Sequence, residues 1–67
     1  MMAQLMLEGG PYRGHFLSVK DPGEELRIRM FESGVAAVYR RRGELMEMSR
    51  FIIGTYDFLD LMESADS

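Results

Sequence analysis

Apolar and polar residues alternate along most of this chain, which is the pattern of β-strands with one buried face. The clearest case is residues 25–31, where Leu26 and Ile28 alternate with Arg27 and Arg29. Each alternating segment is short and is followed by residues that favour turns. We therefore predict five short strands, at residues 3–7, 15–20, 25–31, 35–42 and 46–53. The last segment could also begin a helix, and the β-branched pair Ile52 and Ile53 before Gly54 favours a strand.

Glycine and proline separate these segments and predict structural turns. The first corner follows residue 8, where Pro11 directs the preceding Gly10 toward extended backbone angles and Gly9 is free to take a positive φ. A second turn follows Lys20, because Asp-Pro-Gly combines a side-chain acceptor, a preset φ and a flexible residue. The residues assigned to structural turns are Gly9, Gly10, Pro11, Gly14, Pro22 and Gly23.

The pattern changes near the C-terminal end, where residues 55–63 have Tyr56, Leu59 and either Met62 or Glu63 at helical spacing. A polar residue at the start of this segment can cap a helix, and acids in its first turns favour one. We predict one short helix here, which either covers an apolar face of the sheet or is presented to a partner, and the small size of the chain favours the first role. Residues 64–67 are expected to be a frayed tail.

These elements predict a mainly β protein of the α+β class, with one compact domain over residues 1–67. The sheet is expected to be a small antiparallel meander or an open barrel, because every connection is short and parallel crossovers need longer ones. In the fourth strand the buried face is formed either by Val35, Ala37 and Tyr39 or by Ala36 and Val38.

With 67 residues, the chain can bury only a small core. It has no cysteine and a single histidine, His15, so disulfides and a structural zinc site of the Cys/His kind are excluded. Self-association is the remaining usual source of stability for a domain of this size, and we expect a homodimer.

Charge is unevenly distributed along the chain, although the net charge is only −3. All eight Lys and Arg residues lie between Arg13 and Arg50, whereas the segment after Gly54 is acidic. Such asymmetry indicates either a surface that binds a partner or ion pairs between the acidic segment and the basic strands of the same chain. The candidate partner-binding residues are Arg13, Arg27, Arg29, Tyr39, Arg40, Arg41, Arg42, Tyr56 and Phe58.

The glycine-rich corner at residues 9–14 invites comparison with phosphate-binding loops. Such loops direct several backbone N–H groups at an anion, usually before a helix. Here Pro11 removes one N–H group, and a strand is expected to follow. A structural turn is the better interpretation. Because His15 and Ser18 fall on opposite faces of one strand, they form no local catalytic pair, and we expect neither an enzyme nor a bound cofactor or metal.

The corner, with the later stretches AVYRRRG and RFIIGTYDF, resembles small uncharacterised proteins of actinobacteria and their bacteriophages. The motif that carries this resemblance consists of Gly9, Gly10, Pro11 and Gly14. The resemblance implies a phage or phage-derived origin.

Three classes of function are compatible with these observations. The first is a small phage-type accessory protein that binds a host or phage protein through a sheet edge or an apolar face and inhibits it. The second is an assembly component that acts as an oligomer. The third is a nucleotide or nucleic-acid-binding module that uses the arginine-rich strands, which a pI near 5.0 disfavours. No membrane-spanning or targeting segment is apparent, and we expect a cytoplasmic protein of the bacterial host.

Overall fold

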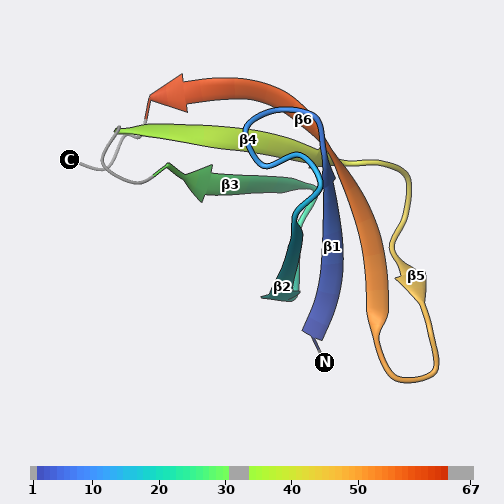
Figure 1. Ribbon diagram of the computed structural model, residues 1–67. Coiled ribbons are helices and arrows are strands. Elements are labelled where there is room, and N and C mark those ends of the chain that lie inside the picture. Colours follow the sequence, from blue (N-terminus) through green and yellow to red (C-terminus); the bar gives the residue numbers. More distant parts are fainter. Residues whose placement is uncertain (1, 31–33, 64–67) are drawn as a thin grey trace.

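The computed structural model describes residues 2–30 and 34–63, and the described part of the chain is entirely β-structure and turns (Figure 1). No helix there could span a membrane. The six strands are β1 (Met2–Glu8), β2 (Phe16–Lys20), β3 (Glu25–Arg29), β4 (Val35–Arg41), β5 (Met46–Glu47) and β6 (Ile52–Glu63).

The strands form one curled sheet in the order β2-β1-β6-β4-β3, with β5 paired to the start of β6. The long strand β6 joins two parts of the sheet that point in different directions (Figure 1). Its first half lies beside β1, and its second half lies beside β4. We call β3, β4 and residues 58–63 of β6 the β3–β4–β6 arm.

The expectation of a purely antiparallel sheet is wrong, because β1 and β6 run parallel. The argument from short connections applied only to consecutive strands. Here the paired strands are the first and the last, so all the intervening chain serves as their connection. The other pairs in the sheet are antiparallel, and the sheet is therefore mixed.

The expected C-terminal helix is also wrong, since residues 55–63 belong to β6. Tyr39 pairs with Phe58 and Val38 pairs with Asp60, so Leu59 is an extra residue that forms a β-bulge. The bulge shifts the alternation of faces by one residue. Phe58 and Leu61, on either side of the bulge, therefore share the inner face at a spacing of three, which is also a helical spacing.

The predicted fifth strand at residues 46–53 is divided by a tight turn. Its first part is the short strand β5, and its last two residues already belong to β6. The backbone N–H of Met48 donates to the carbonyl oxygen of Phe51 at 2.8 Å, which closes the turn. The strand was predicted from the β-branched pair Ile52 and Ile53 before Gly54, and these two residues do lie in a strand, β6.

The core lies on the inner face of the curled sheet, and the alternation predicted for the first three strands is confirmed there. Leu5 and Leu7 of β1 are buried, and Leu17 of β2 and Leu26 of β3 pack beside them. The fully or almost fully buried residues of this cluster are Ala3, Leu5, Leu7, Ala37, Tyr39 and Tyr56.

Strand β4 is buried on both faces, and of the two alternatives for its inward side the structure confirms the one with Ala37 and Tyr39. Ala37 and Tyr39 belong to the inner core. On the outer face, Val38 is only 1% exposed, and its register partners on the neighbouring strands are Arg27 and Asp60. The expected frayed tail at residues 64–67 lies outside the described residues.

Candidate protein-binding surface

The corner after β1 is held by the side chain of Tyr39. Its hydroxyl donates to the carbonyl oxygen of Gly9 at 2.7 Å and accepts from the backbone N–H of Tyr12 at 3.0 Å. Both Gly9 and Gly10 have positive φ, at 78° and 69°, so the expectation for Gly9 is confirmed and the extended angles expected for Gly10 are wrong. Gly10 lies against Phe58, where a Cβ atom would come within 2.4 Å of the ring.

The backbone N–H groups that follow Pro11 are already engaged within the corner. Those of Tyr12 and Arg13 donate to the Tyr39 hydroxyl and to the Gly10 carbonyl, the latter at 3.3 Å. Those of Gly14 and His15 donate to the carbonyls of Leu7 and Tyr12, at 2.9 and 3.1 Å. Because a phosphate-binding loop needs such groups to be available, this geometry is that of a structural turn.

The second turn is held in the same way by Tyr56, whose hydroxyl donates to the carbonyl oxygen of Gly23. Burial raises the pKa of the Tyr56 hydroxyl. Tyr39 and Tyr56 are both 0% exposed. These two candidates for a partner surface therefore lie in the core, where each secures a turn.

The three arginines at residues 40–42 each have different neighbours. Arg40 pairs in register with Glu25 on one side and Asp57 on the other. The side chain of Arg41 donates to the carbonyl oxygen of Gly43 at 3.0 Å. Since neighbouring residues of a strand point to opposite faces, Arg41 lies on the face opposite to that of Arg40, and the three guanidinium groups do not form one basic patch.

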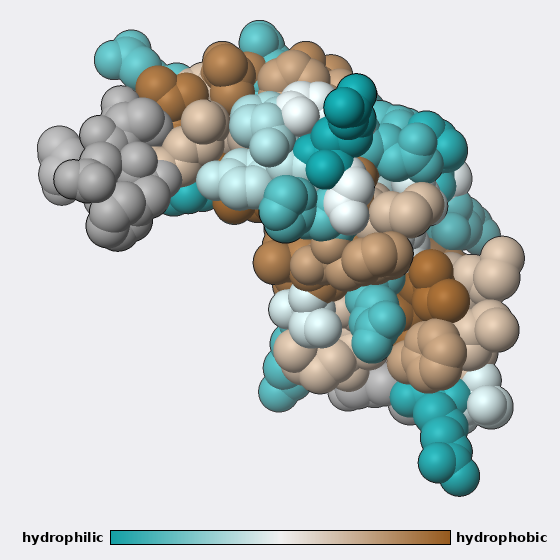
Figure 2. Space-filling view, in the orientation of Figure 1, coloured by the Kyte–Doolittle hydropathy of each residue, from teal (hydrophilic) through white to brown (hydrophobic). Residues whose placement is uncertain are grey.

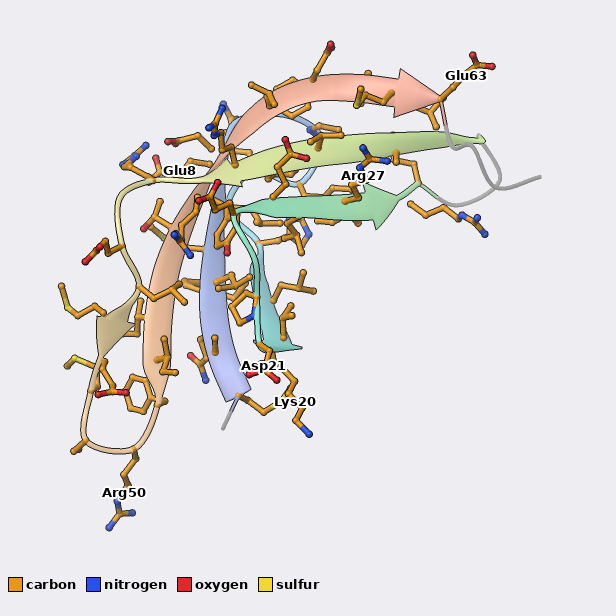
Figure 3. All side chains as sticks on the ribbon, turned by 180° about the vertical axis from the view of Figure 1, so that it is seen from behind. Glu8, Lys20, Asp21, Arg27, Arg50 and Glu63 are labelled. Carbon is orange, nitrogen blue, oxygen red and sulfur yellow. The ribbon has the colours of Figure 1, made fainter. Side chains whose placement is uncertain are left out.

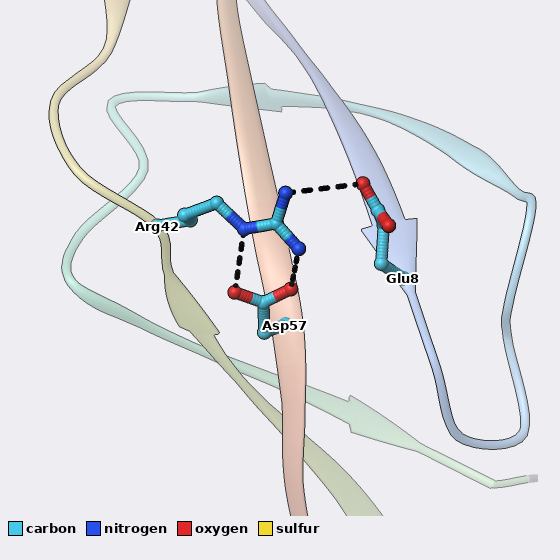
Figure 4. Close-up of polar contacts among 3 residues, drawn as sticks. All are labelled: Glu8, Arg42 and Asp57. Atoms are coloured by element: carbon cyan, nitrogen blue, oxygen red, sulfur yellow. Dashed lines mark hydrogen bonds and ion pairs between the residues drawn. The ribbon is translucent and has the colours of Figure 1, made fainter.

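Arg42 forms an ion-pair cluster with two carboxylates on the outer face (Figure 4). Its guanidinium donates to both carboxylate oxygens of Asp57, at 2.9 and 2.5 Å, and lies 3.5 Å from the carboxylate of Glu8. The hydrogen bond from Arg42 is the main reason that the pKa of Asp57 is lowered from its ordinary value. The cluster connects β1, β6 and the chain that follows β4.

Next to the first corner, the surface has a depression of about 310 Å³. Glu8 and Arg13 are its charged residues, and Arg13 is thereby the one predicted binding residue that lines it. The depression is lined by Met6, Leu7, Glu8, Gly9, Arg13 and Gly14.

Among residues 2–30 and 34–63, no three His, Cys, Asp or Glu side chains are grouped as metal ligands.

The β3–β4–β6 arm presents apolar side chains at its surface (Figure 2). Leu59, Leu61 and Met62 are exposed by 52%, 48% and 45%. Phe58, a predicted binding residue, is half-buried and packs edge-on against Tyr39, with ring centroids 5.6 Å apart. The candidate residues named from the sequence did not include these three exposed ones.

The arm also has two open strand edges. The pairing of β1 with β6 ends at Glu8 and Asp57, so residues 58–63 have no partner strand on the side away from β4 within the described chain (Figure 1). Strand β3, which carries Arg27 and Arg29, is likewise at the end of the strand order. Figure 3 shows Arg27 and Glu63 on this arm.

No family model, curated protein or solved structure matches this chain.

Proposed function

We propose that this protein acts by binding another protein chain through the β3–β4–β6 arm, without catalysing a reaction. The observation that carries the proposal is the open edge of β6 at residues 58–63, beside three exposed apolar side chains. An open edge offers backbone N–H and C=O groups to an incoming extended segment, and apolar side chains on the strand supply contact area.

The arm is better suited to this role than the other surfaces. Its side chains combine apolar area with the charges of Asp60, Glu63 and Arg27, whereas the arginines of the 40–42 run are dispersed.

In the free protein the carboxylate of Asp60 accepts from the backbone N–H of Leu61 at 2.7 Å, which satisfies one donor of the strand. An incoming strand would compete with this local hydrogen bond.

The biological role that we propose is that of a phage-type accessory protein, which occupies a surface of a host or phage protein and inhibits it. The resemblance of the glycine-proline corner to small actinobacterial and phage proteins supports this role. It also suggests an actinobacterial lysate as the source of partners.

The proposal is tested by capture of proteins on the tagged chain from a nuclease-treated actinobacterial lysate to which untagged chain has been added. We expect a protein to be retained, whether from the lysate or the untagged chain itself, and Leu61→Lys to reduce its retention. Phe16→Lys is the matched control, because Phe16 is 72% exposed on β2, outside the arm. Retention that Leu61→Lys leaves unchanged would contradict the proposal, as would retention that depends on nucleic acid.

A further inference from the structure

We infer that the open edge of β6 binds strand β3 of a second copy of this chain, so that successive copies extend one sheet head to tail. This inference rests on the part of the proposed function by which the arm binds a protein chain, and it names a second copy, in place of a host protein, as the chain bound at the open edge. It follows from three properties of the two open edges: their direction, the faces on which their side chains lie, and their charge.

The directions of the strands make the two edges compatible. Both β3 and β6 run antiparallel to β4, so β3 and β6 run parallel to each other within the arm. A second copy added in the same orientation therefore presents β3 parallel to β6. The lengths also match, because β3 has five residues and the open segment of β6 covers residues 58–63.

The faces of the two strands are defined by their common neighbour β4. Ala37 pairs with Ile28 on one side and with Leu61 on the other, so these two side chains share the inner face. In the same way, Arg27 and Asp60 share the outer face through Val38. When β3 of the second copy is placed with Ile28 beside Leu61, Arg27 lies beside Asp60.

This arrangement joins apolar side chains on the inner face and opposite charges on the outer face. Opposite charges on neighbouring strands stabilise a pairing, and like charges destabilise it. The arrangement also covers both open edges of the arm, because each copy uses β6 toward one neighbour and β3 toward the other.

Symmetric dimers match the two edges less well. An antiparallel pair of β3 strands centred on Arg27 would set Glu25 opposite Arg29, but it would place Arg27 opposite its own copy and leave β6 open. A pair of β6 strands would gather the acidic residues Asp60 and Glu63 of both copies without a cation. The head-to-tail contact is heterologous, so it generates rings or filaments.

The test is a charge-exchange cycle measured by sedimentation equilibrium over a range of protein concentrations at low salt. We expect the average mass of the wild-type chain to rise with concentration beyond that of a dimer. Arg27→Glu and Asp60→Lys should each weaken association about tenfold, because each converts an attraction into a repulsion. The variant with both substitutions, and an equimolar mixture of the two single variants, should associate again.

Matched controls are Arg50→Glu and Glu47→Lys, which reverse exposed charges in the β5–β6 hairpin, outside the arm. Both should associate like the wild type. If Asp60→Lys loses the dispersed amide NMR spectrum of the folded protein, Asp60→Asn replaces it, because the amide oxygen still accepts from Leu61 and the charge is absent.

A wild-type chain that stays monomeric throughout the range would overturn the inference, as would an association that stops at the dimer or is not restored in the double variant. A monomer that still captures a lysate protein, with capture reduced by Leu61→Lys, would leave the proposed function intact. A chain that neither associates nor captures a protein would contradict both.

Discussion

Gly10 is the position at which a single added carbon would disturb the most neighbours in the first corner. A Cβ atom there would lie 2.4 Å from the Phe58 ring and 2.9 Å from the Tyr39 hydroxyl. That hydroxyl holds the corner through Gly9 and Tyr12. The identity of this one residue therefore affects both the packing of two aromatic rings and the hydrogen bonds of the turn.

We expect Gly10→Ala to lower the free energy of unfolding by about 2–3 kcal/mol, because it combines a positive φ with a steric clash. Gly14→Ala is the matched control. Its φ is also positive, at 84°, but nothing lies within 4 Å of the added Cβ, and it should cost only about 1 kcal/mol. Urea unfolding with an unchanged slope measures both values. Equal losses of stability in the two variants would show that the close approach of Gly10 to Phe58 adds nothing to the cost of the substitution.

At the scale of elements, the ion pairs of Arg42 link segments that are distant in sequence. The guanidinium contacts Glu8 at the end of β1 and Asp57 in β6. All three side chains are about half-exposed, at 56%, 43% and 42%, so solvent screens the interaction. The contribution of this cluster to stability is best detected through its dependence on pH.

The pKa of Asp57 is lower in the folded chain, chiefly because Arg42 donates a hydrogen bond to the charged carboxylate. As the pH falls below about 4, the unfolded chain takes up this proton first. The stability from the pair is thus present at neutral pH and is lost as the pH falls toward the lowered pKa.

We expect Asp57→Asn to reduce the difference in unfolding midpoint between about pH 7 and about pH 3. Glu47→Gln, in the exposed strand β5, is the control and should keep the wild-type difference. Urea titrations at each pH provide the measurement. An Asp57→Asn variant with the full acid sensitivity of the wild type would show that the cluster does not affect folding.

At the scale of the whole molecule, β6 is the strand on which the two halves of the sheet depend. β1 and β2 form one antiparallel pair, and β3 and β4 form another. The two pairs are joined in the sheet only through β6, as far as the described chain extends. A two-stranded pair is marginally stable by itself in water.

Truncation after Gly54 is therefore expected to unfold the protein. It removes the residues of β6 that pair with β4 and half of those that pair with β1. The measurement is the dispersion of the amide NMR spectrum, together with the cooperativity of thermal unfolding. Truncation after Glu63 is the control and should preserve both. A chain ending at Gly54 that still melts cooperatively would contradict the central role of β6.

Much of the local structure could be predicted from the sequence, because its causes are local. The alternation of Leu26 and Ile28 with arginines determines a strand with one apolar face, whatever lies beside it. The glycines of the first corner determine a turn, since few other residues adopt a positive φ without strain. The sequence also indicated that charge would be divided between basic strands and an acidic C-terminal segment.

The tertiary structure alone decided the state of residues 55–63 and the nature of the candidate surface. A strand exists there because β1 and β4 provide its hydrogen-bond partners, and both are distant in the chain. The bulge at Leu59 follows from that pairing and hides the alternation. Tyr39 and Tyr56 can be buried without an unsatisfied hydroxyl because carbonyl groups about 30 residues away accept from them. Such partners are set by the register of the sheet, and no pattern of neighbouring residues encodes them.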